Sequence, residues 1–263
     1  MSPSSVLLGV SLKMYFDHNR TRSWCTEVAE LARRHESLVS GAVTLVVLPG
    51  FTSLATTVEI FTGTGVLVGA QDLFWEDRGA FTGEVSGADL TDVGCTFVEI
   101  GHAERRALFG EGPAVIAKKL AAAARNGLTP ILCVGEASLG TPREAAQACI
   151  EQLNASLIEI SPTDRGMQIV VAYEPEWAIG AAEPAQADYV AAVAVLLRDW
   201  LATRLGEGSA RVIYGGSAKP GLLSELGGSV DGLFLGRFAH DATALRQILD
   251  EAAARSHQHA NLK

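Results

Sequence analysis

Short apolar runs recur along the chain, and each ends where polar or glycine-rich residues begin. Most of these runs are rich in leucine or β-branched residues and lack alternation between apolar and polar positions. That pattern is typical of strands buried on both faces, as in a parallel sheet. It predicts strands at Val6–Leu12, Leu45–Leu48, Leu67–Ala70, Phe97–Ile100, Ile131–Val134, Ile169–Tyr173, Val212–Tyr214 and Leu233–Leu235.

Amphipathic stretches with helical spacing lie between many of these runs. The clearest are Pro113–Arg125, Arg143–Leu157, Ala185–Leu205 and Ala242–Ala254. Strands that alternate with helices form either a closed (β/α)8 barrel or an open doubly wound sheet. A doubly wound dinucleotide fold would show GxGxxG after its first strand, but the first run continues into GVSLKMYF. The missing glycine pattern favours the barrel.

Polar residues at the ends of the runs support the same choice. Lys13, His102, Glu174 and Ser217 each lie at or just past the end of a predicted strand. In (β/α)8 barrels, functional residues lie at the C-terminal ends of the strands. Taken singly, each of these residues has an ordinary explanation as an ion pair, a solvated side chain or a turn. Their shared position predicts one site at one end of a barrel.

Length and composition agree with one large domain. The chain has 263 residues, of which 48% are hydrophobic and 19% are charged. No linker rich in proline or serine, low-complexity segment or internal repeat divides it. We therefore expect a single domain over residues 1–263, with tails at about 1–5 and 256–263.

Charge and cysteine content narrow the classes of partner. A formal net charge of -9 would repel a nucleic-acid backbone or an anionic membrane, so neither is expected as a partner. A small anionic metabolite is compatible with this charge, because a few local donors can outweigh a screened global field. The four cysteines form no CxxC pair and no zinc-ligand spacing, and no signal peptide or membrane span stands out. We expect a cytoplasmic protein with reduced thiols and no metal.

Four segments carry a more specific signal: KMYF at 13–16, GHAERR at 101–106, AYEPEWAIG at 172–180 and YGGSAKP at 214–220. Three further segments support them: AFTGEVS at 80–86, CVGE at 133–136 and DGLFLG at 231–236. In this order, and over almost the whole chain, they resemble triosephosphate isomerase. The resemblance implies a single-domain (β/α)8 barrel that moves a carbonyl along a small sugar phosphate, with no metal or organic cofactor.

The resemblance assigns catalytic roles to four residues. Glu174 is the base that removes a proton from one carbon and returns it to the next, and His102 is the neutral electrophile. A helix that begins just after His102 would disfavour a charged imidazolium. Lys13 stabilises the negative enediolate and the phosphate. Glu104 matches a buried glutamate near the lysine, which either organises the site or relays protons.

Phosphate binding, by the same resemblance, depends on backbone N–H groups and not on a basic cluster. Gly180, Ser217, Gly236 and Arg237 occupy the matching positions. Glycines let the backbone approach an anion closely, and a short helix N-terminus adds its dipole.

A lid and a dimer loop are also implied. Residues 175–185, which include Trp177, match a mobile lid that excludes water from the enediolate, and Tyr214 matches the tyrosine that holds the lid closed. Glu183 and Pro184 stand where small and basic hinge residues are usual, and proline restricts the backbone there. The segment Phe74–Glu84 resembles a loop that inserts into a neighbouring subunit. Thr82 matches the residue that reaches the partner's catalytic region, so a homodimer is expected.

Three departures from the family pattern lie close to the expected substrate. Ser11 stands where asparagine is usual, Ala103 where serine is usual, and Arg237 where the second glycine of a Gly-Gly pair is usual. Leu12 also replaces an aromatic residue, and Tyr15 a polar one.

These departures favour a substrate slightly larger than a triose. The first hypothesis is an isomerase for four-carbon ketose phosphates, which interconverts L-erythrulose 1-phosphate and D-erythrulose 4-phosphate. The second is an ordinary triosephosphate isomerase, acting on glyceraldehyde 3-phosphate and dihydroxyacetone phosphate. The third is a non-catalytic barrel that binds phosphate metabolites, because fold alone does not establish catalysis.

Overall fold

Eight strands follow one another along the chain in the computed structural model, which describes residues 5–160, 168–179 and 185–260. They are β1 (Val6–Ser11), β2 (Val43–Leu48), β3 (Leu67–Ala70), β4 (Phe97–Ile100), β5 (Thr129–Val134), β6 (Ile169–Tyr173), β7 (Ala210–Gly215) and β8 (Gly232–Leu235). All the predicted strands are present, and their ends differ from the predictions by a residue or two.

Helices follow most of the strands. They are α1 (His18–Arg34), α2 (Glu36–Val39), α3 (Leu54–Phe61), α4 (Gly87–Val93), α5 (Ala103–Phe109), α6 (Pro113–Arg125), α7 (Pro142–Ser156), α8 (Ala187–Leu205), α9 (Leu222–Leu226) and α10 (Ala242–Ala260). The four predicted helices are all present. However, α10 runs past the expected end at Ala254 and enters the segment expected as a tail. No glycine or proline interrupts the sequence there, so nothing ends the helix earlier.

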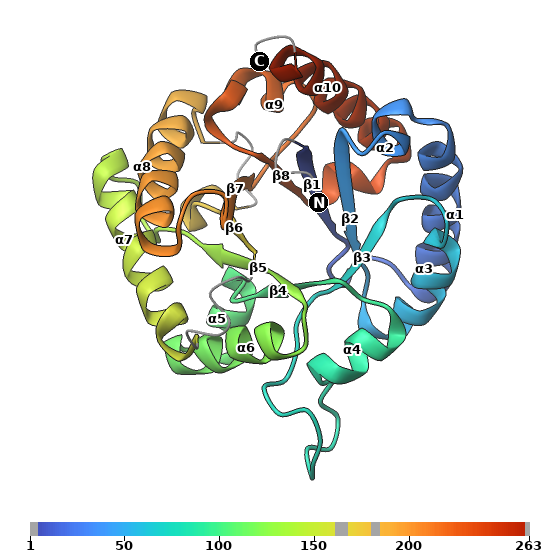
Figure 1. The fold of residues 1–263 in the computed structure, drawn as a ribbon, viewed down its shortest axis with the longest axis horizontal. Helices are drawn as coiled ribbons and strands as arrows, with labels where there is room; N and C mark the ends of the chain where they lie inside the picture. Colours follow the sequence, from blue (N-terminus) through green and yellow to red (C-terminus); the bar gives the residue numbers. More distant parts are fainter. Residues whose placement is uncertain (1–4, 161–167, 180–184, 261–263) are drawn as a thin grey trace.

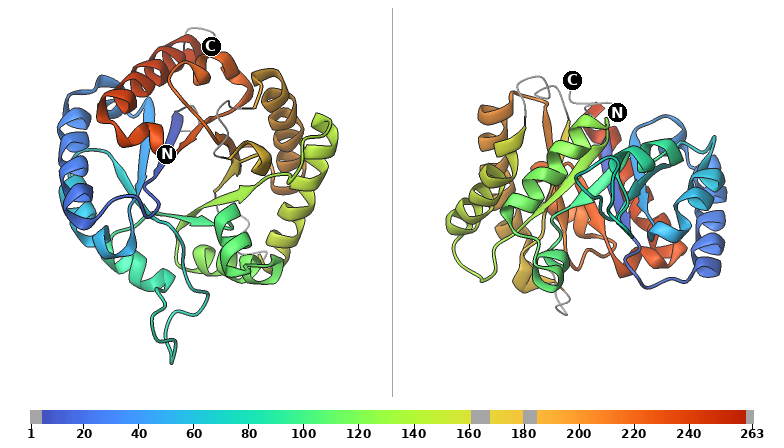
Figure 2. Two further views of the ribbon diagram at one scale, coloured as in Figure 1. Left: turned by 180° about the vertical axis from the view of Figure 1, so that it is seen from behind. Right: turned by 90° about the horizontal axis from the view of Figure 1, so that it is seen from below.

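The strands close into one parallel barrel, with the helices around its outside (Figure 1). The first strand joins both edges of the sheet, because Leu8 lies opposite Leu45 of β2 and opposite Leu233 of β8. Figure 2 shows the same ring of helices from behind and the barrel from the side. The expected single-domain (β/α)8 barrel is therefore confirmed.

The buried residues form two cores. One lies between the strands and the helices, and the other fills the barrel with residues such as Leu7, Phe97 and Phe234. Successive side chains of a strand point to opposite faces, so two residues spaced by two share a face. Glu99, two residues after Phe97 on β4, is therefore directed into the barrel interior.

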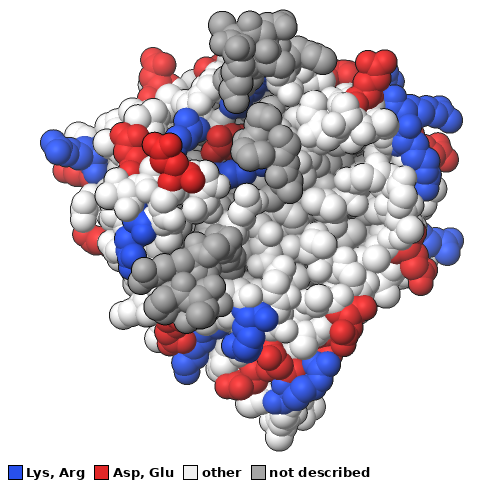
Figure 3. All heavy atoms as spheres, viewed as in Figure 1, with Lys and Arg blue, Asp and Glu red and all other residues white. Residues whose placement is uncertain are grey.

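Charged side chains of both signs lie interspersed toward the outline of the face seen in Figure 3. A long segment between β3 and α4 projects away from the barrel (Figure 1). Its base is joined by a bridge between Phe74 and Ser86, while residues 78–84 at its end are exposed. Of the helices described, none is long and apolar enough to cross a membrane.

Candidate active site

One cavity of about 230 Å³ lies where the carboxyl ends of several strands meet. It brings together eight of the residues predicted to act on the substrate: Ser11, Lys13, His102, Glu104, Glu174, Ser217, Gly236 and Arg237. The rest of its lining comes from Tyr15, Ile179, Gly216, Phe234, Leu235 and Phe238. Its volume is below the usual range for drug-sized ligands and suits a small metabolite.

Glu174 follows directly after β6, and its side chain is buried in the cavity wall. Its backbone N–H donates to Val134 O at 2.8 Å, which continues the pairing with β5. The neighbouring strand β7 requires a residue without a side chain beside Glu174, because a Cβ on Gly215 would lie only 2.4 Å from Glu174 Oε1. Glu174 Oε2 is buried and has no hydrogen-bond partner among the described residues.

His102 is the N-cap residue of α5, and its Nδ1 accepts the backbone N–H of Glu104 at 3.1 Å. An imidazole nitrogen that accepts a hydrogen bond carries no proton, so a neutral ring holds its proton on Nε2. That Nε2 lies 3.5 Å from Glu174 Oε2, so the two side chains reach the same part of the cavity. The start of α5 thus orients His102 so that its Nε2, and not its Nδ1, is directed toward Glu174.

Lys13 extends from the end of β1 with a backbone φ of 47°, in the left-handed region that non-glycine residues seldom adopt. Gln71 Nε2 donates to the Lys13 carbonyl at 3.0 Å and holds this turn. Lys13 Nζ lies 2.7 Å from Glu104 Oε1. Burial by itself lowers the pKa of Lys13, but the Glu104 hydrogen bond and nearby carboxylates raise it overall, so the ammonium stays charged.

Ser217, Gly236 and Arg237 line the part of the cavity after β7 and β8, and these two strands lie between β6, which precedes Glu174, and β1, which precedes Lys13. Gly236 precedes a short 3-10 helix (Arg237–His240), and Gly216 has a φ of 140°, which favours glycine. The side chain of Arg237 is exposed. Gly180, the fourth expected phosphate contact, lies outside the described residues, as do Glu183 and Pro184 of the expected lid hinge.

Three other predicted residues do not line the cavity. Trp177 donates its Nε1 to Glu136 Oε1 at 2.8 Å, and Tyr173 and Tyr189 donate to the same oxygen. Tyr214 is fully buried on β7, and burial raises its pKa to about 12. Thr82 is exposed at the end of the projecting segment.

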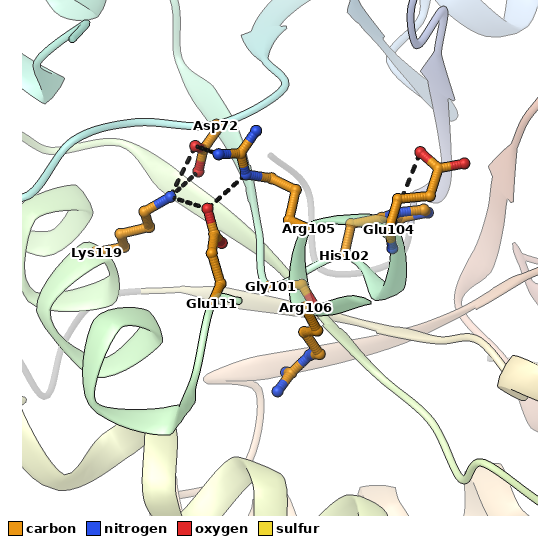
Figure 4. Close-up of polar contacts among 8 residues, drawn as sticks. All are labelled: Asp72, Gly101, His102, Glu104, Arg105, Arg106, Glu111 and Lys119. Carbon is orange, nitrogen blue, oxygen red and sulfur yellow. Dashed lines mark hydrogen bonds and ion pairs between the residues drawn. The ribbon is translucent and has the colours of Figure 1, made fainter. Parts of the chain in front are cut away.

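A buried ion cluster fixes α5 from the side opposite His102 (Figure 4). Lys119 Nζ on α6 lies 2.6 Å from Asp72 Oδ1 and 2.5 Å from Glu111 Oε1. Arg105 on α5 contacts the same two carboxylates. Its Nη2 lies 2.9 Å from Asp72 Oδ2, and its Nε lies 2.6 Å from Glu111 Oε1. Because Arg105 lies in the first turn of α5, the cluster anchors the helix start that presents His102.

Sequence reasoning missed Glu99, which is 3% exposed and buried in the barrel interior. Ser11 Oγ donates to Glu99 Oε2 at 2.9 Å. Burial raises the pKa of Glu99 to about 7, with Glu174 adding to the rise while His102, Ser11 and Lys13 oppose it. An acidic residue inside the otherwise apolar run FVEI was the signal that could have revealed it.

Some of the residues that depart from the family pattern line the cavity, and others do not. Ser11 and Arg237 line it, as does Tyr15. Ala103 instead lines a smaller recess beside Glu174 and Cys133. The side chain of Leu12 is buried outside the cavity lining. Ser11, Tyr15 and Arg237 are thus the changes that border the cavity.

Comparison with known proteins places these residues in a family context. Residues 6–252 match the family model described as triosephosphate isomerase. The chain is 52% identical to an L-erythrulose-1-phosphate isomerase from Pectobacterium atrosepticum, over 98% of this chain and all of the relative. It is 43% identical to a triosephosphate isomerase from Moorella thermoacetica, over 89% of this chain and 94% of the relative. It is 36% identical to an L-erythrulose-1-phosphate isomerase from Brucella abortus, over 94% of this chain and 96% of the relative.

Proposed function

The chain belongs to the triosephosphate isomerase family of isomerases, and from that premise we propose that it interconverts L-erythrulose 1-phosphate and D-erythrulose 4-phosphate. The observation that carries the chemistry is the geometry of one pair: Glu174 Oε2 lies 3.5 Å from the proton-bearing Nε2 of His102. The substrate assignment is supported by the 52% identity to a relative named for that substrate.

Carbonyl transfer needs one base, one electrophile and one cation. Glu174 removes the proton from the carbon next to the carbonyl, and the electron pair moves to the carbonyl oxygen as the C–H bond breaks. His102 Nε2 donates a hydrogen bond to the oxygen on which charge develops, while the Lys13 ammonium neutralises the enediolate. Glu174 then returns the proton to the neighbouring carbon, the proton of the adjacent hydroxyl passes to the former carbonyl oxygen, and the carbonyl re-forms one position along.

Glu104 serves this chemistry by organising the other two groups. Its backbone N–H holds His102 Nδ1, and its carboxylate holds the Lys13 ammonium at 2.7 Å. The phosphate binds after β7 and β8, against Ser217, Gly236 and Arg237, which line the cavity. Anchoring the phosphate there orients the reacting carbons toward Glu174, since both groups line the same cavity.

The four-carbon substrate carries a hydroxymethyl group where the triose aldehyde carbon carries hydrogen. Replacing the family's usual asparagine by Ser11 removes about two side-chain heavy atoms, which roughly matches the added group. An unfilled space of that size weakens binding of the smaller triose by about 1–3 kcal/mol. We therefore expect kcat/KM to favour tetrulose phosphate over glyceraldehyde 3-phosphate by about tenfold or more.

Assays of the purified protein on tetrulose and triose phosphates, side by side, test this proposal. A preference for the tetrulose is the expected result, and Ser11→Asn should shift the preference toward triose by crowding the hydroxymethyl group. Efficient triose turnover without tetrulose activity would leave an ordinary triosephosphate isomerase. Binding without exchange of substrate carbon-bound hydrogen with solvent would indicate a non-catalytic barrel.

A two-fold dimer is also part of the proposal. The segment Phe74–Glu84 projects from the barrel with Thr82 exposed near its end. On the same chain Met14, next to the catalytic Lys13, is 97% exposed, and an apolar side chain in that position is well suited to burial by a partner. Light scattering at micromolar concentration should give the dimer mass, and a monomer alone would contradict this expectation.

The cytoplasm is the compartment we propose. The four cysteines Cys25, Cys95, Cys133 and Cys149 are buried and form no disulfide, which is typical of a reducing environment. Fractionation of the native host, followed by immunodetection of the protein, tests this, and recovery outside the cytoplasm would contradict it.

A further inference from the structure

Glu99 is an acid placed where the barrel needs only apolar packing. It shares the interior face of β4 with Phe97, and it does not line the substrate cavity. Its contact with the site passes through Ser11, whose Oγ lies 2.9 Å from Glu99 Oε2 and which does line the cavity. Burying a carboxyl group costs free energy unless its partners compensate, so an apolar residue would serve packing better.

The hydrogen bond between these residues determines what Ser11 can offer a ligand. A hydroxyl group has one proton to donate and two lone pairs that accept. Because the Ser11 proton is directed to Glu99 Oε2, the oxygen facing the cavity can only accept. The amide that the family usually carries at this position offers two N–H donors as well as an acceptor.

We propose that Glu99 is a positioning residue for substrate selection: by taking the Ser11 proton, it makes Ser11 Oγ an acceptor for the terminal hydroxyl of the tetrulose phosphate. This inference rests on the proposed four-carbon substrate. The hydroxymethyl hydroxyl of that substrate can donate to Ser11. A triose has no such group at this place and leaves the acceptor unused.

The direction of the Ser11 hydrogen bond depends on the charge of Glu99. Burial raises the pKa of Glu99 to about 7, and the ionisable groups around it are His102 at the start of α5, Glu174 after β6 and Lys13 after β1. Cys133 on β5 also faces it, and burial keeps the pKa of that thiol high, so it stays neutral. Once protonated, Glu99 can donate to Ser11 Oγ, and Ser11 then loses its role as a dedicated acceptor. Selectivity for the tetrulose should therefore fall as pH drops through about 7.

The test measures a selectivity ratio, defined as kcat/KM for tetrulose phosphate divided by kcat/KM for glyceraldehyde 3-phosphate. Titration of groups that both reactions share, such as the substrate phosphate, largely cancels in this ratio. The informative variants are Glu99→Met, which removes the acceptor at similar volume, and Glu99→Gln, which keeps an amide oxygen but cannot titrate. The Ser11→Ala variant, together with the double variant that combines Ser11→Ala and Glu99→Met, completes a double-mutant cycle. Ser53→Ala, a buried serine outside the cavity lining, is the matched control.

We expect Glu99→Met to lower the ratio by about tenfold, the effect of one hydrogen bond, mostly through KM for the tetrulose. Glu99→Gln should make the ratio independent of pH. Glu99→Met should have no further effect on the ratio in the Ser11→Ala background, while Ser53→Ala should leave the wild-type ratio unchanged. A cooperative urea unfolding transition in each variant shows that the barrel has folded.

The possible failures can be told apart. A wild-type enzyme that does not prefer the tetrulose overturns the proposed function, and the role of Glu99 with it. A wild-type preference that Glu99→Met leaves intact overturns the role of Glu99 alone. That role is also overturned if Glu99→Met lowers the ratio equally with and without the Ser11 hydroxyl, because Glu99 would then act by another route.

Discussion

Replacing the buried Glu99 by glutamine should change how protein stability depends on pH. Burial raises the pKa of Glu99 from its ordinary 4.5 to about 7 in the folded protein. Between those values the folded protein holds a proton that the unfolded chain has released. The contribution of Glu99 to wild-type stability is therefore greatest below about pH 4.5, and this contribution is lost as pH rises to about 7.

The size of the change in stability follows from the rise in the pKa of Glu99. Each pKa unit corresponds to about 1.4 kcal/mol. Above neutral pH, the ionised Glu99 therefore lowers the free energy of unfolding by about 3 kcal/mol. Glutamine is neutral at every pH and keeps an oxygen that can accept from Ser11. The stability of Glu99→Gln relative to wild type should accordingly increase by about 3 kcal/mol between about pH 5 and about pH 8.

Urea unfolding at several pH values, at one fixed protein concentration, measures this difference. Glu144→Gln is a control with the opposite sign, because the backbone hydrogen bond from Thr141 lowers the pKa of this exposed glutamate. Its replacement should reduce stability at high pH, since the stabilising charge is then absent. A difference between wild type and Glu99→Gln that stays flat across this pH range would refute the raised pKa of Glu99.

Three further substitutions test other parts of the site. Glu174→Gln keeps the shape of the side chain but removes the base, so kcat should fall by at least about a hundredfold in steady-state assays, with little change in binding of a phosphate analogue. Gly215→Ala places a Cβ 2.4 Å from Glu174 Oε1, and displacement of the base should lower kcat by about tenfold or more while thermal stability changes little. Lys119→Met removes one of the two cations that hold Asp72 and Glu111 and leaves Arg105 as the other, so urea unfolding should show a loss of about 1–3 kcal/mol.

Each of these expectations has a clear contrary result. Turnover near wild type in Glu174→Gln would mean that another group is the base. Unchanged kcat in Gly215→Ala would mean that Glu174 can relax without losing its catalytic position. A Lys119→Met protein as stable as wild type would show that the ion cluster around Asp72 does not hold the start of α5.

The sequence by itself determined the barrel and most of the predicted residues that line the cavity. Runs such as Phe97–Ile100 are apolar enough to be buried on both faces, and this local property made all eight strands predictable. Lys13, His102 and Glu174 were found because they end such strands within recognisable motifs. The end of α10 was less predictable, since a polar composition does not stop a helix that lacks a breaker.

Only the tertiary structure decided which side chains meet. Ser11 and Glu99 are 88 residues apart, on strands that are not neighbours in the sheet, and they touch only because the barrel closes around a shared interior. Alternation along a strand indicates which face a residue occupies, but it does not indicate what faces it from across the barrel. The same holds for the proton on His102, whose position depends on a hydrogen bond formed when α5 begins. Glu99 is connected to this site because its side chain meets Ser11 across the barrel, and residue type alone does not reveal such contacts.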